Sequence, residues 1–554
     1  MNFTADFETT TDVEDCRVWA TGICAINDDY NFEYGNNIDF FFHHAFLHPG
    51  STYYFHNLKF DGEFILYWLF KHGYKHTLKT KLTEDKLFST LISKQGAFYC
   101  LRFSFEINNK IETILVIDSL KILPFSVDEV AKAFNLPLYK LELDYNAYRP
   151  VGYKLNEHDI EYLKHDVVIM AQGLHILFRE GLTKMTQGSN AFNDYKNIIG
   201  KKKFARYFPI PAYDFDIRQS YKGGFTYCNP KFANKNICEG IVLDVNSLYP
   251  SVMYECMLPY GEGIYFDGEY KQDKLYNLYV IMFTCQFELK DGYIPTIQLK
   301  NTLGFIPTEY VTSSNGEDIT LCLTSVDLRL FLEHYNVYNL TYHGGWKFKS
   351  TNKLFKDYID KWMKVKEEST VNGNKAMRTL AKLMLNALYG KFALNPNVQC
   401  KIPFLDSNDV VKYAPGPEET RNPIYIPVGT FITAWARYKT ITSAQKLYDR
   451  FIYADTDSLH LVGTEIPKEL DIHPTKLGAW KLESTFTSAR FLRAKTYIEE
   501  IEGELHITCA GMPKQCYKNV TWDNFLKGTS FSGKLQPKHV KGGIVLTDTP
   551  FTIK

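Results

Sequence analysis

An apolar strand, a turn with two acids and a second apolar strand occupy residues 451–461, FIYADTDSLHL. This pattern predicts a β-hairpin that carries Asp455 and Asp457 at its tip. Aspartate is common in plain turns. Two carboxylates at an otherwise apolar tip are nevertheless costly unless a cation pairs with them. The fold therefore has to bring a positive partner, such as a divalent metal ion, to this tip.

A second acid follows a strand much earlier in the chain. Residues 241–244, IVLD, form a β-branched run that ends in Asp244, and Pro250 is expected to end or bend the element that follows. Two strands that each carry an acid at one end can share a cation if the fold brings those ends together.

Cations lie between these acids in the sequence, at a spacing that places them on one face of a helix. Lys375, Arg378, Lys382, Asn386 and Tyr389 recur at steps of three or four residues. A solvated basic face is the ordinary interpretation of such a stripe. Here the stripe ends in an amide and an aromatic ring, and this combination suits a triphosphate with a stacked base.

The first third of the chain has its own set of acids. Asp6 and Glu8 lie on one side of a predicted strand, and Asp61 follows residues 53–60, which are predicted to be an aromatic strand end. Tyr162 and Asp166 are four residues apart on a predicted helix. Acids from several elements, with a hydroxyl to orient water, suit two-metal hydrolysis of a phosphodiester.

Charge is distributed unevenly along the 554 residues, although 63 basic and 63 acidic residues give a net charge of zero. A protein that coats nucleic acid through overall basicity is excluded. Residues 1–66 contain 2 basic and 11 acidic residues (2 − 11 = −9), residues 353–412 contain 11 and 6 (11 − 6 = +5), and residues 486–541 contain 9 and 5 (9 − 5 = +4). The basic segments predict a polyanionic partner.

The length and the cysteines suggest a multidomain cytosolic protein. At about 150 residues per domain, the chain is expected to form three or four domains. The 11 cysteines contain no CxxC pair, no basic and apolar leader opens the sequence, and the apolar run 64–70 is too short to span a bilayer. A GxxxxGK[ST] motif is absent from the sequence, which argues against ATP-driven unwinding.

Eight motifs, taken in order, resemble those of family B DNA polymerases, specifically the protein-primed phi29 type of small phages. DVNSLYP at 244–250 resembles motif A, KLMLNALYG at 382–390 resembles motif B, and YADTDS at 453–458 resembles motif C. KTY at 495–497 resembles the KxY motif, and YKGG at 221–224 resembles the YxGG motif. Residues 6–8, 57–61 and 162–166 resemble the three exonuclease motifs, and the likeness extends to the final FTIK.

The resemblance implies an α/β (α+β) multidomain fold with an RNase-H-like 3′–5′ exonuclease domain and a right-hand polymerase. The wide gap between Pro250 and Lys382 predicts an inserted module, and the family has two insertions peculiar to its protein-primed members. The implied domains are 1–183 exonuclease, 184–255 palm (first part), 256–353 first insertion, 354–393 fingers, 394–421 second insertion, 422–509 palm (second part) and 510–554 thumb.

The resemblance also implies residue roles. Asp244, Asp457, the neighbouring Asp455 and the backbone of Val245 would hold the polymerase metals, and Tyr249 would stack under the sugar and exclude a 2′-hydroxyl. Incoming nucleotides would contact Ser247, Tyr249, Lys366, Arg378, Lys382, Asn386 and Tyr389. Exonuclease metals would be held by Asp6, Glu8, Asp61 and Asp166, with Tyr162 and Lys140 assisting hydrolysis. DNA would contact Thr9, His56, Asn57, Phe60, Ser119, Leu120, Tyr221, Gly223, Gly224, Lys495 and Tyr497.

Two departures from the family pattern stand out. Arg378 occupies a position where relatives carry lysine, which keeps the charge but replaces a point charge with a planar fork. Residues 498–507 form a shorter segment than is typical of the branch.

The expected function is template-directed DNA synthesis with strand displacement and proofreading, primed by the hydroxyl of a terminal protein. The expected cofactors are Mg²⁺, two ions in the polymerase site and two in the exonuclease site, with Mn²⁺ as an alternative. The expected partners are primer–template DNA, dNTPs and the terminal protein, with no membrane. The enzyme is expected to be a monomer that pairs with the terminal protein at initiation, in the cytoplasm of an infected bacterium.

Three alternatives remain at this point. A reverse transcriptase would place two acids directly next to each other, whereas Thr456 separates Asp455 from Asp457. A non-catalytic DNA-binding replication or packaging protein with a vestigial polymerase fold would lack some of the acids. A free-standing nuclease would leave the chain beyond about Thr183 unexplained.

Overall fold

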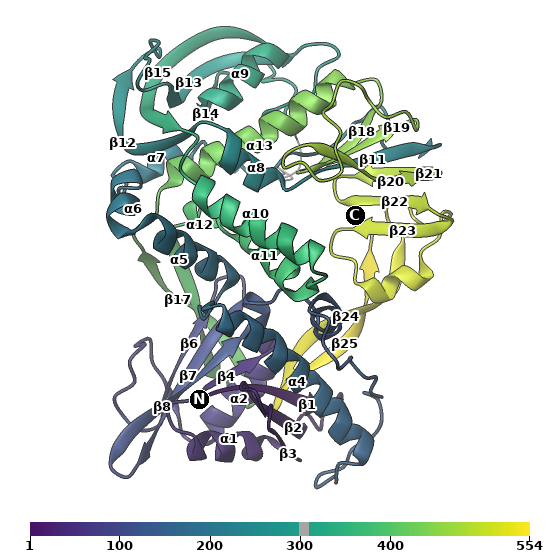
Figure 1. Ribbon diagram of the computed structural model, residues 1–554. Coiled ribbons are helices and arrows are strands. Elements are labelled where there is room, and N and C mark those ends of the chain that lie inside the picture. Colours follow the sequence, from purple (N-terminus) through teal and green to yellow (C-terminus); the bar gives the residue numbers. More distant parts are fainter. Residues whose placement is uncertain (299–309) are drawn as a thin grey trace.

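The structure is a computed structural model that describes residues 1–298 and 310–554. Part of the predicted first insertion, residues 299–309, lies outside the described residues. The elements follow one another from a sheet at the N-terminus, through a central sheet with helices, to a hairpin at the C-terminus (Figure 1).

An eight-stranded mixed sheet forms the N-terminal part. Its strand order is β3-β2-β1-β4-β8-β7-β6-β5, and β1 runs antiparallel to β2 but parallel to β4. The strands are β1 (Asn2–Thr9), β2 (Val18–Ala25), β3 (Phe32–Gly35), β4 (Thr52–Phe55), β5 (Lys75–His76), β6 (Leu87–Ile92), β7 (Phe98–Ile107) and β8 (Lys110–Asp118). The helices are α1 (Ile38–Leu47), α2 (Leu58–Lys71), η1 (Ser119–Lys121), α3 (Val127–Ala133) and α4 (Glu157–Arg179).

A five-stranded sheet in the order β20-β11-β19-β18-β9 forms the centre of the C-terminal two-thirds of the chain. Its strands are β9 (Thr226–Cys228), β11 (Gly240–Val245), β18 (Phe451–Asp455), β19 (Ser458–Val462) and β20 (Trp480–Phe486). Helices α8 (Leu248–Glu255) and α13 (Ile426–Lys446) pack against each other beside it. Most of α13 is buried, which agrees with its small and apolar composition.

A separate four-stranded sheet, β12-β15-β13-β14, occupies the top of the view in Figure 1. It is built from β12 (Leu258–Asp267), β13 (Leu278–Leu289), β14 (Ile319–Thr324) and β15 (Tyr335–Thr351), with α9 (Ser325–His334) against it. A lone hairpin, β16 (Asn397–Leu405) with β17 (Val411–Thr420), extends to the N-terminal sheet, where Cys400 bridges to Ser93.

Helices lie between the two halves of the molecule (Figure 1). They are α5 (Gln187–Ile199), α6 (Lys201–Tyr207), α7 (Asp214–Arg218), α10 (Lys356–Val371), α11 (Lys375–Ala387) and α12 (Tyr389–Phe392). The side chain of Asn374 accepts a hydrogen bond from the backbone of Met377 and so caps α11.

The C-terminal residues form a second four-stranded sheet and a hairpin. The sheet contains β10 (Asn236–Ile237), β21 (Ser488–Arg493), β22 (Thr496–Ile501) and β23 (Glu504–Cys509), and η2 (Lys514–Asn519) follows it. The hairpin of β24 (Ser530–Val540) and β25 (Gly543–Thr552) reaches back to α2 of the N-terminal part (Figure 1). The boundaries and names of the seven domains stay predictions.

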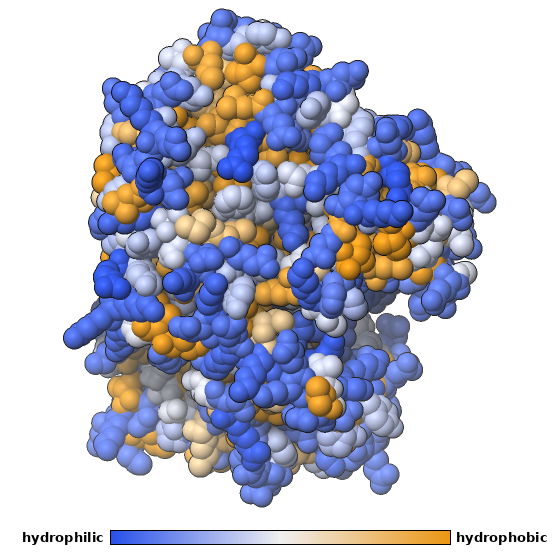
Figure 2. Space-filling view, turned by 45° about the horizontal axis from the view of Figure 1, so that its top comes forward, coloured by the Kyte–Doolittle hydropathy of each residue, from blue (hydrophilic) through white to orange (hydrophobic). Residues whose placement is uncertain are grey.

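Separate apolar cores underlie the two halves. One core lies between the N-terminal sheet and the helices that pack on it. A larger core lies between the central sheet and α10, α11, α13 and part of α4. On the face shown in Figure 2, hydrophobic residues form separate patches among hydrophilic ones. Within the described residues, no helix combines the length and the apolar character needed to cross a bilayer.

Most predicted elements are confirmed, and three are wrong in detail. The helix predicted to carry Lys375 to Tyr389 ends at Ala387, and Tyr389 begins the separate helix α12. The predicted strand end at 53–60 stops at Phe55, because Asn57 adopts a left-handed conformation (φ 70°) and α2 begins at Leu58. Asp61 therefore lies in the first turn of a helix. Pro250 neither ends nor bends an element, because it lies in the first turn of α8, where proline costs no internal hydrogen bond.

Candidate active sites

Asp244, near the end of β11, and Asp457, in the turn before β19, lie close together because these two strands are neighbours in the central sheet. Asp244 on β11 is paired with Ser458, the residue after Asp457, on the neighbouring strand β19. The backbone N–H of Val245 donates a hydrogen bond to the carbonyl oxygen of Asp457 at 2.8 Å. Two acids far apart in the sequence are thus held together by the backbone.

Burial destabilises the charged forms of both carboxylates. Burial raises the pKa of Asp244 to about 7, with a further contribution from the negative charge of Asp457. The pKa of Asp457 is also raised, chiefly by burial. A site that raises the pKa of its acids favours a cation, which would restore the charged forms.

The turn between the hairpin strands is fixed by residues from other elements. Thr456 adopts a left-handed conformation (φ 60°), and its backbone N–H donates to the carbonyl of Phe225 at 2.6 Å. The hydroxyl of Thr440 donates to the carbonyl of Thr456, also at 2.6 Å. A Cβ added to Gly224 would lie 2.6 Å from the Thr456 hydroxyl, so this glycine allows the loop to approach closely.

Asp455 differs from its two neighbours because protein donors surround it. The Nζ of Lys495 lies 2.9 and 3.1 Å from its oxygens, the hydroxyl of Thr226 donates at 3.0 Å, and that of Tyr453 donates at 3.2 Å. These contacts favour a role in holding Lys495, and they do not favour the predicted role as a metal ligand. Tyr497, two residues after Lys495, stacks on Phe491 at 4.8 Å.

A cluster of cations belongs to the same site. Burial and the positive charges of Lys382 and Arg378 lower the pKa of Lys366 on α10, and burial and Arg378 lower that of Lys382 on α11. Within residues 1–298 and 310–554, none of these three side chains forms an ion pair with a carboxylate. Cations that repel one another without a protein anion form a suitable site for phosphate groups.

An aromatic pair and two polar residues complete this site. The rings of Tyr249 on α8 and Tyr389 on α12 stack at 3.9 Å and 16°. Ser247 precedes α8 in a left-handed conformation (φ 55°), and Asn386 is exposed on α11. Stacked aromatic side chains next to a phosphate site offer a surface for a sugar and a base.

The predicted exonuclease acids also come together. Asp6 and Glu8 on β1 and Asp166 on α4 each offer an oxygen, and these oxygens lie within 4.8 Å of one another. Burial, aided by the charge of Asp166, raises the pKa of Asp6 to about 7. The pKa values of Glu8, Asp61 and Asp166 are raised as well, chiefly by burial.

Two buried carboxylate oxygens, one in this cluster and one on the neighbouring Asp61, fit a cation for a further reason. Oδ1 of Asp61 and Oδ1 of Asp166 are buried without a hydrogen-bond partner. Buried polar atoms are normally satisfied, so an unpaired carboxylate oxygen beside other acids is a suitable ligand for a cation. Oxygen ligands of this kind suit a hard ion such as Mg²⁺.

Lys140 and two tyrosines border the exonuclease acids. The Nζ of Lys140 donates to the Tyr162 hydroxyl at 3.0 Å and forms an ion pair with Asp166. Burial alone would lower the pKa of Lys140, but the Asp166 carboxylate outweighs it and the pKa is raised. Tyr145, which the sequence motifs did not identify, shares a hydrogen bond of 2.7 Å with the Tyr162 hydroxyl.

Residues predicted to bind a single strand lie near the same acids. His56 contacts the Ser119 hydroxyl at 3.0 Å, and Oδ1 of Asp118 accepts bonds from the backbones of Asn57 and Leu120, each at 3.0 Å. Asp118 was not a sequence candidate. Phe60, in the first turn of α2, packs against Phe64 with ring centroids 5.7 Å apart.

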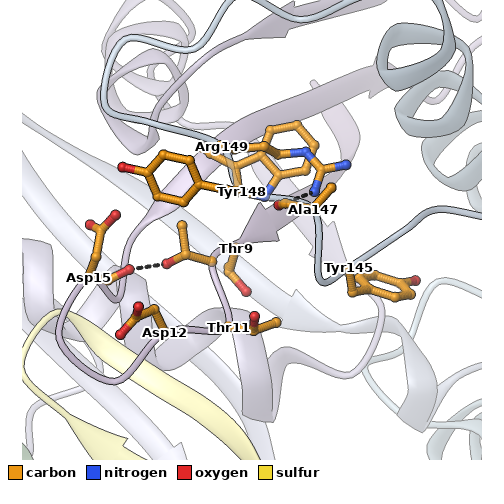
Figure 3. A pocket seen from close by; sticks show the side chains of 10 residues that line it. Thr9, Thr11, Asp12, Asp15, Tyr145, Ala147, Tyr148 and Arg149 are labelled. Atoms are coloured by element: carbon orange, nitrogen blue, oxygen red, sulfur yellow. Dashed lines mark hydrogen bonds between the residues drawn. The ribbon is translucent and has the colours of Figure 1, made fainter.

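A small pocket opens next to this cluster (Figure 3). Thr9 and Thr11 from the end of β1 and the following loop face Tyr145, Tyr148 and Arg149 across it. The pocket borders the exonuclease acids because Tyr145 bonds to Tyr162.

The raised pKa values predict a pH-dependent response to divalent ions. In the ion-free protein, the pKa of Asp6 rises from 3.8 to about 7, so folding retains a proton there and stability falls as the pH increases through this window. Addition of Mg²⁺ should therefore raise the melting temperature by about 2–4 °C at pH 8, and by much less at pH 6. Thermal melts with Mg²⁺ or EDTA at both pH values measure this effect, and equal shifts at the two pH values would contradict it.

The sequence motifs missed several residues that the structure brings to these sites. Thr226 and Lys481 reach Asp455 and Asp244 from neighbouring strands, at 3.0 Å and 4.0 Å respectively. Neither has a motif of its own. Only the strand pairing, which the sequence did not predict, places them there.

Comparison with known proteins gives a consistent result. The family described as DNA polymerase type B, organellar and viral, matches residues 45–473. The DNA polymerase of Bacillus phage phi29 is 47% identical over 100% of this chain and 99% of its own length. The DNA polymerase of Streptococcus phage Cp-1 is 34% identical over 100% of this chain and 98% of its own.

Solved structures agree with these relatives. Phi29 DNA polymerase complexed with primer–template DNA and incoming nucleotide substrates matches with a TM-score of 0.94 and 46% identity, and the match covers 100% of both chains. The same enzyme complexed with single-stranded DNA matches with a TM-score of 0.93. These matches confirm the predicted fold class, a mixed α/β multidomain protein with exonuclease and polymerase parts.

Proposed function

The chain belongs to the type B DNA polymerases of the organellar and viral family, among the phi29-type phage enzymes, and we propose that it combines protein-primed, strand-displacing synthesis with 3′–5′ proofreading. The main support for the polymerase assignment is that Asp244 and Asp457 lie close together, with the cations Lys366, Arg378 and Lys382 nearby. Membership of this family argues against a reverse transcriptase and a free-standing nuclease. The presence of every expected acid argues against a non-catalytic DNA-binding protein with a vestigial polymerase fold.

In the proposed polymerase reaction, Asp244, Asp457 and the backbone carbonyl of Val245 hold two divalent ions. Such ions, when bound, lower the pKa of the primer 3′-hydroxyl and neutralise charge on the triphosphate in the in-line displacement of pyrophosphate. The side chains of Lys366, Arg378 and Lys382 bind the phosphates.

The other residues of this site position the substrates. Tyr249 lies under the sugar of the incoming nucleotide and excludes a 2′-hydroxyl, while Tyr389 stacks on the base. Ser247 and Asn386 add polar contacts to the nucleotide. Lys495, held by Asp455, and Tyr497 hold the primer end. Tyr221, Gly223 and Gly224 guide the DNA between the two active sites, supported by the contact of Gly224 with the hairpin turn.

In the proposed exonuclease reaction, Asp6, Glu8, Asp61 and Asp166 hold the ions. Tyr162, which accepts a hydrogen bond from Lys140 and shares one with Tyr145, orients the attacking water. Thr9, His56, Asn57, Phe60, Ser119 and Leu120 bind the frayed strand. The unpaired oxygens of Asp61 and Asp166 support this assignment.

The proposed cofactor is Mg²⁺ in both sites, with Mn²⁺ as an alternative, because all the side-chain ligands are carboxylates. The proposed setting is the cytoplasm of the infected bacterium. There the enzyme acts as a monomer and pairs with a terminal protein when replication begins.

A direct test of the polymerase function is primer extension on a primed template with four dNTPs and Mg²⁺. We expect template-dependent products that are longer than the primer and that disappear when EDTA removes the metal. A protein that extends no primer under these conditions would contradict the proposal.

Protein priming has a separate test. Incubation with a candidate terminal protein, labelled dATP and Mg²⁺ should produce a covalent adduct between protein and nucleotide, because the priming hydroxyl enters the site that otherwise takes a 3′-hydroxyl. Gel electrophoresis under denaturing conditions detects this adduct, and Asp457→Ala should form none. Absence of an adduct with every plausible terminal protein would overturn protein priming while leaving the polymerase assignment intact.

A further inference from the structure

Lys481 lies on the edge strand β20, directly opposite Asp244 in the strand pairing. Its Nζ lies 4.0 Å from Oδ2 of Asp244, the outer limit of an ion pair, and its side chain is 35% exposed. Residues that face each other across paired strands are held side by side by the backbone. The fold therefore places a lysine next to Asp244 in the proposed polymerase site.

Lys481 also belongs electrostatically to the phosphate-binding cluster. Burial lowers the pKa of Lys382, and the positive charges of Arg378 and Lys481 lower it further. Lys481 contributes in the same sense to the lowered pKa of Lys366. Four cations from three elements, α10, α11 and β20, thus surround the same space.

The partner of Lys481 is a carboxylate that the reaction requires for another purpose. If Asp244 holds divalent ions, the ammonium group of Lys481 loses this partner and is repelled by the ions. A lysine stem is flexible, and its ammonium group is a mobile point charge. The negative groups then left near it would be the Glu483 carboxylate, two residues further along β20, and the triphosphate bound by Lys366, Arg378 and Lys382, of which the triphosphate carries more charge.

Resting on the proposed polymerase function, we propose that Lys481 is a fourth phosphate-binding residue, which leaves Asp244 and contacts the triphosphate of the incoming dNTP. The same contact would hold the pyrophosphate product. Lys481 would then increase the affinity for every dNTP, and it would not affect which of the four dNTPs is selected.

A simpler role would be that of a counter-ion which only neutralises Asp244 before metal binds. The two roles predict different changes. Loss of a counter-ion would alter the Mg²⁺ concentration needed for half-maximal activity and leave dNTP affinity unchanged. Loss of a phosphate ligand would weaken dNTP binding at saturating metal.

The test compares Lys481→Gln with Lys481→Arg and with Lys364→Gln. Lys364 is a matched control because it lies on α10 near Lys366, is 75% exposed and pairs only loosely with Glu368 at 3.8 Å. Two quantities are measured: KM and kcat for insertion of a single nucleotide at saturating Mg²⁺, and the Kd of the next correct dNTP for the enzyme–primer–template complex in Ca²⁺. Thermal melts check that each variant is folded.

We expect Lys481→Gln to raise both KM and Kd for dNTP roughly tenfold, as for loss of one charge-assisted contact, with little change in kcat. Inhibition by pyrophosphate should weaken in parallel. Lys481→Arg should retain most of the affinity, and Lys364→Gln should behave like the unsubstituted enzyme.

An unchanged dNTP Kd in folded Lys481→Gln would overturn the inference, and so would a shift confined to the Mg²⁺ requirement. Failure of the unsubstituted protein to extend a primer would contradict the proposed function instead. The role of Lys481 would still be decided by the Kd in Ca²⁺, because that measurement does not depend on turnover.

Discussion

Replacement of Asp457 by alanine is expected to reduce dNTP incorporation by at least about a thousandfold, because one of two carboxylates that hold the proposed metal pair is lost. Asp244→Ala should give a similar loss. The double variant should be little worse than either single variant, since residues that act as a unit lose their effect together. Primer extension under single-turnover conditions measures all three.

Two controls distinguish loss of a catalytic carboxylate from loss of the folded structure. Asp457→Ala should degrade a single-stranded 3′ end at the unsubstituted rate, because the proposed exonuclease acids lie on β1, α2 and α4 of the N-terminal part. Asp471 is a suitable matched control, since this exposed carboxylate pairs with Lys476 at 2.6 Å and its loss should not affect extension. Extension by Asp457→Ala at the unsubstituted rate would refute the polymerase site.

Replacement of Asp61 by alanine should have the opposite effect on the two activities, with loss of 3′-end degradation and retention of primer extension. Degradation of a 3′ end should fall by at least about a thousandfold, because a buried carboxylate of the proposed metal site is removed. Primer extension with matched ends should continue, and mispaired ends should persist. The assay follows a labelled 3′ end in the absence of dNTPs, and then extension from matched and mismatched primers.

Stability provides a second readout for the same variant. The pKa of Asp61 is raised by burial and by neighbouring acids, so its removal should raise the melting temperature of the metal-free protein at pH 8. Glu157→Ala, which removes an exposed carboxylate from the first turn of α4, should affect neither degradation nor stability appreciably. Normal degradation of 3′ ends by Asp61→Ala would show that this cluster is not the exonuclease site.

The local pattern of apolar and polar residues in the sequence was sufficient to predict the helices and strands that carry most of the acids. Alternation placed Asp6 and Glu8 on a strand, helical spacing placed Tyr162 and Asp166 on one helix face, and the polar turn between 451 and 461 predicted the hairpin. The position of Asp61 was predicted wrongly, because aromatic residues favour strands whereas the left-handed Asn57 starts a helix.

Contacts between distant segments could not be predicted in this way. The pairing of β11 with β20 places Lys481 opposite Asp244, and the approach of Gly224 to Thr456 depends on the packing of a loop against the hairpin. Asp455 looked equivalent to Asp457 in the sequence. Its ring of donors, Lys495, Thr226 and Tyr453, becomes visible only in the folded protein.

The most direct measurement is a crystal structure with primer–template DNA, a non-hydrolysable dNTP analogue and Mn²⁺, whose anomalous scattering locates the ions. We expect two anomalous peaks between the carboxylates of Asp244 and Asp457, next to the triphosphate. Peaks that contact neither carboxylate, or a separation of the two acids in the complex, would contradict the proposal that these strand ends form the polymerase active site.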